Sequence, residues 1–263
     1  MNENLNKHRL KYRYLKRRKL LTCIIGAKCA EGTAIISDTR VMRQYEANNE
    51  SKIHLIWEPN PKVVVAGAGT TALIDKFAEA IGKSKIPSTL DFTKVVETIE
   101  DIVFNLRERY EPRIQEDYDF QALIMGFQDF DKGDPYLRLV HGDGISEDVK
   151  DYAIIGHGAP YVTSLFRLLY DNMLTVSELA VLGYFAVSTI VFLGLDQTVG
   201  ITQLGPESVV LKSNEKPCFL NPLDHEFLTT RQSLSSLRFR FKLVKSIWSK
   251  IPQAYENLDP SLF

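Results

Sequence analysis

Three residues with suitable chemistry stand at the ends of neighbouring apolar segments near the start of the chain. Thr22 opens an apolar hairpin, Asp38 follows its second strand, and Lys52 begins the next apolar segment. A threonine hydroxyl is a weak nucleophile that needs a base, and an N-terminal threonine carries one in its α-amine, with a pKa of about 7.7–8.0. A lysine beside the hydroxyl lowers its pKa, and an acid keeps that lysine charged. Each residue alone is more often a plain strand residue or part of a surface ion pair.

The elements that would position these residues follow from the apolar pattern. Residues 21–40 (LTCIIGAKCAEGTAIISDTR) predict two strands joined by a tight turn at 30–32. A strand is also expected over 52–57, after a polar loop at 43–51. The run over 63–69 predicts a buried strand that ends in small residues, where a backbone or ligand comes close.

The rest of the pattern alternates between pairs of helices and groups of strands. This order predicts an α+β fold, a four-layer αββα sandwich in which two antiparallel sheets lie face to face with a helix pair outside each. The expected helices are 70–83, 91–110, 156–172 and 174–195, and the expected later strands are 120–127, 136–141, 152–155, 197–204 and 208–211.

The segment 174–195 is apolar enough to require a test for membrane insertion. Its uncharged run, 179–195, is 17 residues long, at the lower edge of a membrane span. Glu178 and Asp196 bound it, with no cluster of Lys or Arg, so a buried core helix is the better interpretation. Thr175 and Glu178 have the spacing of a capping box at its start. We therefore expect no contact with a membrane.

Both ends of the chain differ from the acidic body. Residues 1–21 form a basic leader with eight cations and one acid, about +7, which leaves about -8 for the rest of a chain of net charge -1. Such a block can bind nucleic acid, but a solvated leader or removable propeptide is favoured, and we expect no nucleic-acid partner. A domain over 22–213 follows, and then a C-terminal extension, 214–263, with a predicted amphipathic basic helix. Three cysteines, an odd number, favour a reducing, cytoplasmic location.

These residues together resemble the start of a proteasome β-type subunit, a threonine peptidase of the N-terminal-nucleophile (Ntn) hydrolase fold. That family places a threonine before the first strand, a glycine four residues on, an acidic-x-Arg motif after the second strand, a lysine before the third and an apolar-Ala-Gly run in the fourth. The matching residues here are Thr22, Gly26, Asp38 with Arg40, Lys52 with Ile53, and Val65-Ala66-Gly67. The likeness covers about 22–211.

The resemblance implies a role for each residue of the site. Thr22 would be nucleophile and base, Lys52 its activator, and Asp38 the residue that orients Lys52. The N–H of Gly67 would stabilise an oxyanion, for which a small residue lets substrate approach. Asp196 would be a further catalytic acid near the nucleophile, and Arg40 would support the site. Val41 and Val65 would form the apolar pocket for the residue before the cleaved bond.

Two positions depart from the family pattern. His157 stands where the family has the serine of a Gly-Ser-Gly motif, and it could either relay a proton or only pack. Leu21 stands where precursors usually carry a glycine, at the processing site between residues 21 and 22. Self-cleavage there needs a kinked backbone that glycine adopts cheaply, so Leu21 makes processing harder.

The expected function is that of a zymogen that matures into a threonine endopeptidase. It would hydrolyse unfolded proteins inside a core particle of heptameric rings, with sister β-type and α-type subunits as partners and with no metal or cofactor. One alternative is a non-catalytic structural or assembly subunit that keeps its leader. Another is an Ntn amidase or peptide ligase that works outside the 20S particle.

Overall fold

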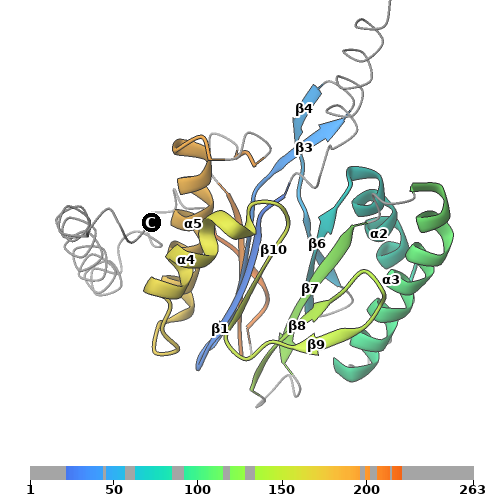
Figure 1. The fold of residues 1–263 in the computed structure, drawn as a ribbon. Helices are drawn as coiled ribbons and strands as arrows, with labels where there is room; N and C mark the ends of the chain where they lie inside the picture. Colours follow the sequence, from blue (N-terminus) through green and yellow to red (C-terminus); the bar gives the residue numbers. More distant parts are fainter. Residues whose placement is uncertain are drawn as a thin grey trace, which may run out of the picture.

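The computed structural model describes residues 22–43, 46–56, 63–84, 92–114, 119–127, 134–195, 199–201, 206–213 and 215–220. Within these residues the chain forms four layers, a helix pair, two sheets and a second helix pair (Figure 1). This arrangement confirms the predicted αββα sandwich. The leader and the predicted amphipathic helix of the C-terminal extension lie outside the described residues.

The predicted hairpin forms the centre of the first sheet. Its strands run antiparallel in the order β10-β1-β2-β11-β12, with Ile24 opposite Ser37 and Cys29 opposite Gly32 across the hairpin. Strand β12 was not predicted, because a two-residue strand leaves no periodic signal. The strands are β1 (Ile24–Cys29), β2 (Gly32–Ser37), β10 (Tyr152–Ile155), β11 (Glu207–Lys212) and β12 (Cys218–Phe219).

The second sheet is an antiparallel meander in chain order, β5-β6-β7-β8-β9. Lys52 immediately precedes its edge strand β5, and Gly67 lies in β6. The strands are β5 (Ile53–Ile56), β6 (Val63–Gly69), β7 (Phe120–Phe127), β8 (Pro135–Val140) and β9 (Ser146–Asp148).

Two local predictions were wrong. The expected loop at 43–51 is part of an antiparallel ribbon of β3 (Arg40–Arg43) and β4 (Glu46–Asn49), which projects from the sandwich (Figure 1). Main-chain pairing needs no apolar alternation, so a strand outside the core gives no such signal. The strand expected over 197–204 is absent from 199–201, the part of it that the structure describes, where Gly200 instead bonds to residues 38–40.

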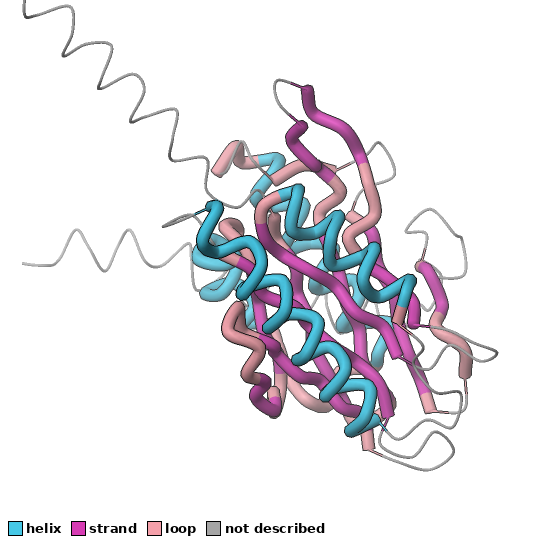
Figure 2. Tube along the Cα trace, turned by 90° about the vertical axis from the view of Figure 1, so that its right-hand side faces the viewer, coloured by secondary structure: helices cyan, strands magenta, loops and turns pink. Residues whose placement is uncertain are grey.

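The helices cover the outer faces of the two sheets. They are α2 (Thr71–Lys83), α3 (Phe92–Ile114), α4 (Ala159–Leu169) and α5 (Val176–Phe192). Figure 2 shows one helix pair lying over the strands of the sandwich. The side chain of Thr175 accepts from the Glu178 N–H and the Glu178 carboxylate accepts from the Thr175 N–H, which confirms the capping box. Among the described helices, none is both long and apolar enough to cross a membrane.

Three apolar cores separate the four layers. One lies between α2–α3 and the second sheet, one between the sheets, and one between the first sheet and α4–α5. Adjacent residues of β1 serve different cores, since Ile24 packs between the sheets and Ile25 packs toward α4–α5. A Cβ at Gly26 would lie 3.0 Å from side-chain carbons of Leu123 and Leu137, so glycine lets the sheets approach there. The packing of these cores thus fixes the ends of β1, β2 and β5, where Thr22, Asp38 and Lys52 lie.

Candidate active site

The structure brings three of the predicted site residues into one buried, hydrogen-bonded group. Lys52 Nζ lies 3.1 Å from Thr22 Oγ1 and 2.9 Å from Asp38 Oδ1. The exposed fractions of Thr22, Lys52 and Asp38 are only 1%, 1% and 0%. The lysine therefore bridges the hydroxyl and the carboxylate at the end of the sandwich, where β1 begins and β2 ends.

The carboxylate of Asp38 is held by main-chain donors from two directions. Its Oδ1 accepts from the Cys23 N–H at 2.8 Å, and its Oδ2 accepts from the Gly200 N–H at 3.3 Å. The Asp38 N–H in turn donates to the Cys23 carbonyl at 3.0 Å. These bonds fix the orientation of the carboxylate, so that one oxygen faces Lys52.

Burial changes the acid-base behaviour of this pair. Loss of solvent raises the pKa of Asp38, against the lowering effect of the Lys52 charge and hydrogen bond. Loss of solvent likewise lowers the pKa of Lys52, against the raising effect of Asp38. A buried lysine with a lowered pKa next to a hydroxyl can exchange a proton or stabilise a developing alkoxide more readily than a solvated one.

A glycine loop holds the main chain of Thr22 in place. The Gly158 N–H donates to the Thr22 carbonyl at 3.1 Å. Gly156 has a φ of +88°, and a Cβ there would lie 2.2 Å from the same carbonyl oxygen, so only glycine fits. His157 lies half-buried between these two glycines. The loop thus carries His157 past Thr22, and the two roles predicted for His157 remain predictions.

Gly67 and Arg40 lie on strands that lead to the site. The Gly67 N–H points toward the Lys52 carbonyl at 3.4 Å, beyond the usual range of about 2.7–3.2 Å, so this contact is weak. The Arg40 N–H donates to the Gly200 carbonyl at 3.1 Å, and a Cβ at Gly200 would meet Arg40 Nε at 2.4 Å. Gly200 was missed by the sequence analysis, although a glycine after an apolar segment is the only signal that could have pointed to it.

The remaining predicted residues are not brought into the group by a described contact. The side chain of Val65 is fully buried in the core between the second sheet and α2–α3. Val41 lies on β3, and its side chain is outside the described atoms, as are Leu21 and Asp196. The pocket and processing assignments therefore stay predictions.

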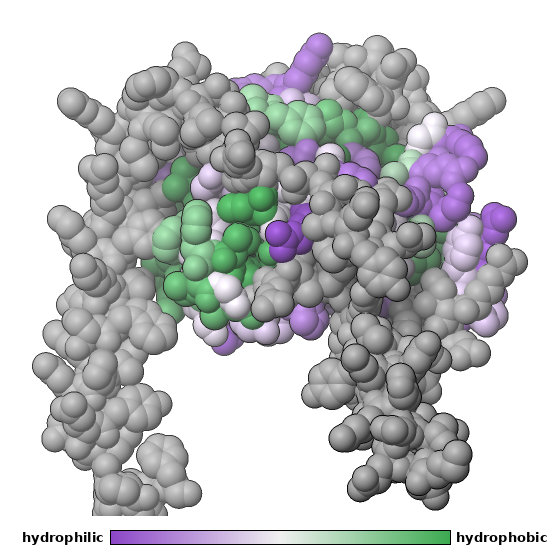
Figure 3. Space-filling view, turned by 90° about the horizontal axis from the view of Figure 1, so that it is seen from above, coloured by the Kyte–Doolittle hydropathy of each residue, from purple (hydrophilic) through white to green (hydrophobic). Residues whose placement is uncertain are grey.

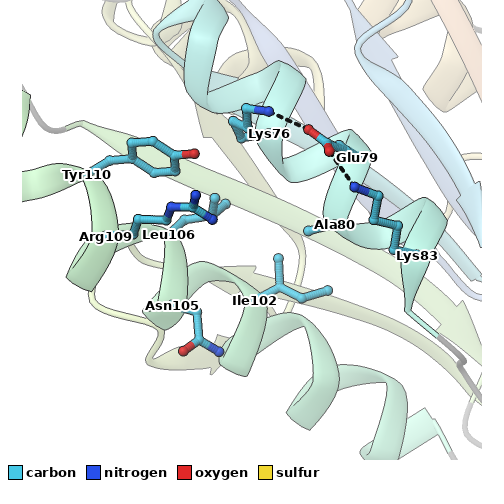
Figure 4. A pocket seen from close by; sticks show the side chains of 9 residues that line it. All are labelled: Lys76, Glu79, Ala80, Lys83, Ile102, Asn105, Leu106, Arg109 and Tyr110. Atoms are coloured by element: carbon cyan, nitrogen blue, oxygen red, sulfur yellow. Dashed lines mark hydrogen bonds and ion pairs between the residues drawn. The ribbon is translucent and has the colours of Figure 1, made fainter.

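A separate pocket of about 510 Å³ lies between α2 and α3, on the outer helix layer (Figure 4). Lys76 and Lys83 both bond to Glu79, and these ion pairs lower the pKa of Glu79 to about 2. Arg109 and Tyr110 face them from α3. Three cations surround one acid here, and these side chains lie on the outer helix layer, away from Thr22. Among the described residues no group of three His, Cys, Asp or Glu side chains is placed to hold a metal ion.

Comparisons with known proteins agree with this fold. A family model described as "proteasome subunit" matches residues 20–195. Among solved structures, Anbu (ancestral beta-subunit) from Yersinia bercovieri has a TM-score of 0.66 at 14% identity, over 87% of this chain and 97% of that chain. Anbu from Hyphomicrobium sp. strain MC1 has a TM-score of 0.58 at 14% identity, over 90% and 98%. Such identities show the fold alone. No curated protein sequence matches the chain.

Proposed function

Because this chain belongs to the proteasome subunit family, we propose that it is a β-type threonine endopeptidase that hydrolyses unfolded polypeptides within a ring of subunits. One observation carries the proposal, the contact of 3.1 Å between Lys52 Nζ and Thr22 Oγ1, with Asp38 bonded to the same nitrogen. A surface ion pair would not be buried or aimed at a hydroxyl. The group has the composition that an activated threonine needs.

In the proposed reaction Thr22 Oγ1 attacks the carbonyl carbon of the substrate peptide bond. The hydroxyl proton passes to the α-amine of Thr22, and Lys52 stabilises the negative charge that develops on the oxygen. The α-amine then gives that proton to the departing amine, which leaves an ester on Oγ1, and a water molecule hydrolyses the ester. Gly67 N–H would stabilise the oxyanion, because its present contact is weak enough to exchange for substrate. The proposal keeps the roles predicted for four further residues. Asp196 is an acid near the nucleophile, His157 relays a proton or only packs, and Val41 and Val65 form the substrate pocket.

The full-length chain would be a latent form. While Leu21 is attached, the nitrogen of Thr22 is an amide and cannot act as a base. The side chain of Thr22 is also inaccessible, with an exposed fraction of 1%. Removal of residues 1–21 would supply the amine, and Leu21 in place of glycine would make self-cleavage slow.

Partner subunits are supported by an exposed apolar face on α4 and α5. We define this α4–α5 apolar face by Tyr161, Leu168, Phe185, Phe192 and Leu193, which are 43%, 55%, 39%, 80% and 67% exposed. Figure 3 shows apolar side chains gathered on the side of the molecule where these helices lie. Helix α5 is apolar on nearly all sides, as expected for a helix that is buried in an assembly. We propose that sister β-type or α-type subunits, in heptameric rings, cover this face in the cytoplasm.

A mass measurement and one substitution test the proposed activity. Purified, assembled protein should have the mass of a chain that begins at Thr22. Thr22→Ala should lower peptidase activity by a factor of at least about 10³. Thr22→Ser should retain part of it. Activity that survives Thr22→Ala would remove Thr22 as the nucleophile.

A non-catalytic assembly subunit is the second candidate, favoured by Leu21 and by the complete burial of Thr22. This candidate predicts that the full-length mass persists in assembled rings. An amidase or peptide ligase would instead show activity in particles smaller than a ring. Native mass spectrometry combined with the peptidase assay separates all three.

A further inference from the structure

Glu207 lies beside the site but has no role in the mechanism described above. It opens β11 in the first sheet, and its half-buried carboxylate contacts residues 51–53, which lead into β5 of the second sheet. Ser51 Oγ donates to both carboxylate oxygens, at 2.7 and 2.9 Å. The backbone N–H groups of Lys52 and Ile53 face this carboxylate and lower its pKa, and the Ile53 N–H also donates to Ser51 Oγ at 3.2 Å. The Glu207 side chain is thus held by Ser51 and faces the backbone of the next two residues.

These bonds connect the two sheets at the point where Thr22, Lys52 and Asp38 come together. In the first sheet Glu207 is paired with Ser37, the residue before Asp38. Its bonds to Ser51 hold the residue before Lys52, and the side chain of Lys52 crosses to Thr22 and Asp38. The relative position of the sheets at this end therefore depends on Glu207, as does the distance from Lys52 to the nucleophile.

We infer that Glu207 is a positioning residue for the proposed threonine hydrolase. It fixes Lys52 against Thr22 and, after Asp38, supplies a second negative charge near the lysine. This inference rests on the proposed function for its effect on catalysis, but its effect on Lys52 can be measured without any activity.

The direction in which the charge of Glu207 shifts the pKa of Lys52 can be tested. Among the described residues, the titratable groups that face Lys52 are Asp38 after β2, Cys23 before β1 and Glu207 on β11. The charges of Asp38 and Glu207 both favour protonated Lys52 and raise its pKa, whereas burial lowers it. Burial likewise raises the pKa of Glu207, while its hydrogen bonds with Ser51 and with the backbone lower it. Loss of the Glu207 charge should therefore lower the pKa of Lys52 further.

Glu207→Gln removes the charge and keeps the size of the side chain. In processed protein we expect kcat to fall by about tenfold to a hundredfold, since a misplaced catalytic group costs about this much. We also expect the limb of the pH-rate profile that reports Lys52 to move to lower pH. Because Lys52 acts as a cation in the proposed mechanism, this is the alkaline limb. The control is Glu215→Gln, which removes an exposed charge nearby on the chain and should leave the pH-rate profile unchanged.

A second measurement works even if the wild-type protein cleaves no peptide. The pKa of Lys52 is measured by NMR on protein with 13C-labelled lysine Cε, with the signal assigned through Lys52→Arg, and crystal structures give the separation of Lys52 Nζ and Thr22 Oγ1. A lower pKa and a separation longer than 3.1 Å in Glu207→Gln support the inference. An unchanged pKa together with an unchanged separation overturns it. An inactive wild-type protein would refute the proposed peptidase activity but not this inference, because neither the pKa nor the separation depends on activity.

Discussion

Thr22, Lys52 and Asp38 are each almost completely buried, and their chemistry depends on that burial. In water a lysine and an aspartate gain little from each other, whereas in the interior each charge needs the other. Lys52 is the only described cation within hydrogen-bond distance of Asp38. Removing it should therefore leave an uncompensated carboxylate.

Lys52→Met should destabilise the protein in a pH-dependent way. At neutral pH we expect a loss of about 3–5 kcal/mol in the free energy of unfolding, the usual effect of breaking a buried pair. Burial raises the folded pKa of Asp38 above its unfolded value of about 3.9, so folding favours the protonated carboxyl. Stability from this group is then present at low pH and lost as pH rises through the folded pKa. Urea unfolding between pH 4 and pH 8 should show a destabilisation that shrinks toward pH 4.

The double variant Lys52→Met with Asp38→Asn serves as the control. It contains no buried charge at this position, so it should be more stable at neutral pH than the single variant and should show little of its pH dependence. A single variant whose loss relative to wild type is the same at every pH would contradict this account of the pair.

Gly156→Ala should be strongly destabilising. The new methyl would meet the Thr22 carbonyl oxygen, and alanine disfavours a φ of +88°. We expect a loss of about 2 kcal/mol or more, together with a displaced Thr22. Gly82→Ala is the matched control, since a Cβ there meets nothing within 4 Å and the residue lies in helix α2, where alanine gains about 0.5–1 kcal/mol. Equal effects on denaturant midpoints would contradict the proposed clash.

At the scale of elements, the cap of α5 places the most apolar helix of the sandwich. The capping box at Thr175 and Glu178 starts α5 over the first sheet, and Gly183 then allows it to approach Ile36, whose atoms would lie 2.5 Å from a Cβ. The start of the helix thus sets which of its faces meets the hairpin.

Thr175→Ala should lower the free energy of unfolding by about 1 kcal/mol, because the Glu178 N–H loses its acceptor at a helix end. Thr98→Ala changes the same residue type within α3, where the residue is half-buried and its side chain bonds to the Lys94 carbonyl. That variant should be neutral or slightly stabilising, since alanine has the higher helix propensity. The two denaturation curves measure the difference, and a cost no larger at Thr175 than at Thr98 would rule out a contribution from the cap.

At the scale of the whole molecule, its two helix layers differ in the surfaces they present. The α2–α3 layer carries charged side chains and ion pairs around its pocket, whereas the α4–α5 apolar face leaves Phe192 at 80% exposed. A water-exposed apolar surface is stabilised when a partner covers it. The asymmetry therefore predicts which layer mediates assembly.

The double change Phe192→Ser with Leu193→Ser should weaken assembly without unfolding the subunit. Native mass spectrometry and sedimentation should show smaller particles than the wild-type protein at equal concentration. Phe104→Ser, on α3 and also half-exposed, is the control that should leave the particle size unchanged. Dissociation by the control but not by the double variant would assign assembly to the other layer.

The hairpin and the layer order could be predicted from the sequence because their signals are local. A run of apolar residues indicates a buried strand, and apolar residues three to four apart indicate a helix. The spacing of Thr175 and Glu178 likewise indicates the start of a helix. The β3–β4 ribbon and Gly200 gave no comparable signal. The ribbon lies outside the core, and Gly200 acts through a bond to a residue far away in the chain.

The sequence by itself determined which residues could form the candidate catalytic group, through a threonine, an aspartate and a lysine at the ends of β1, β2 and β5. The tertiary structure decided that they meet, since Lys52 enters from one sheet while Thr22 and Asp38 belong to the other. It also decided their burial and brought in Glu207, which lies 155 positions after Lys52 in the chain. Distances across two sheets depend on how their faces pack, and no local pattern carries that information.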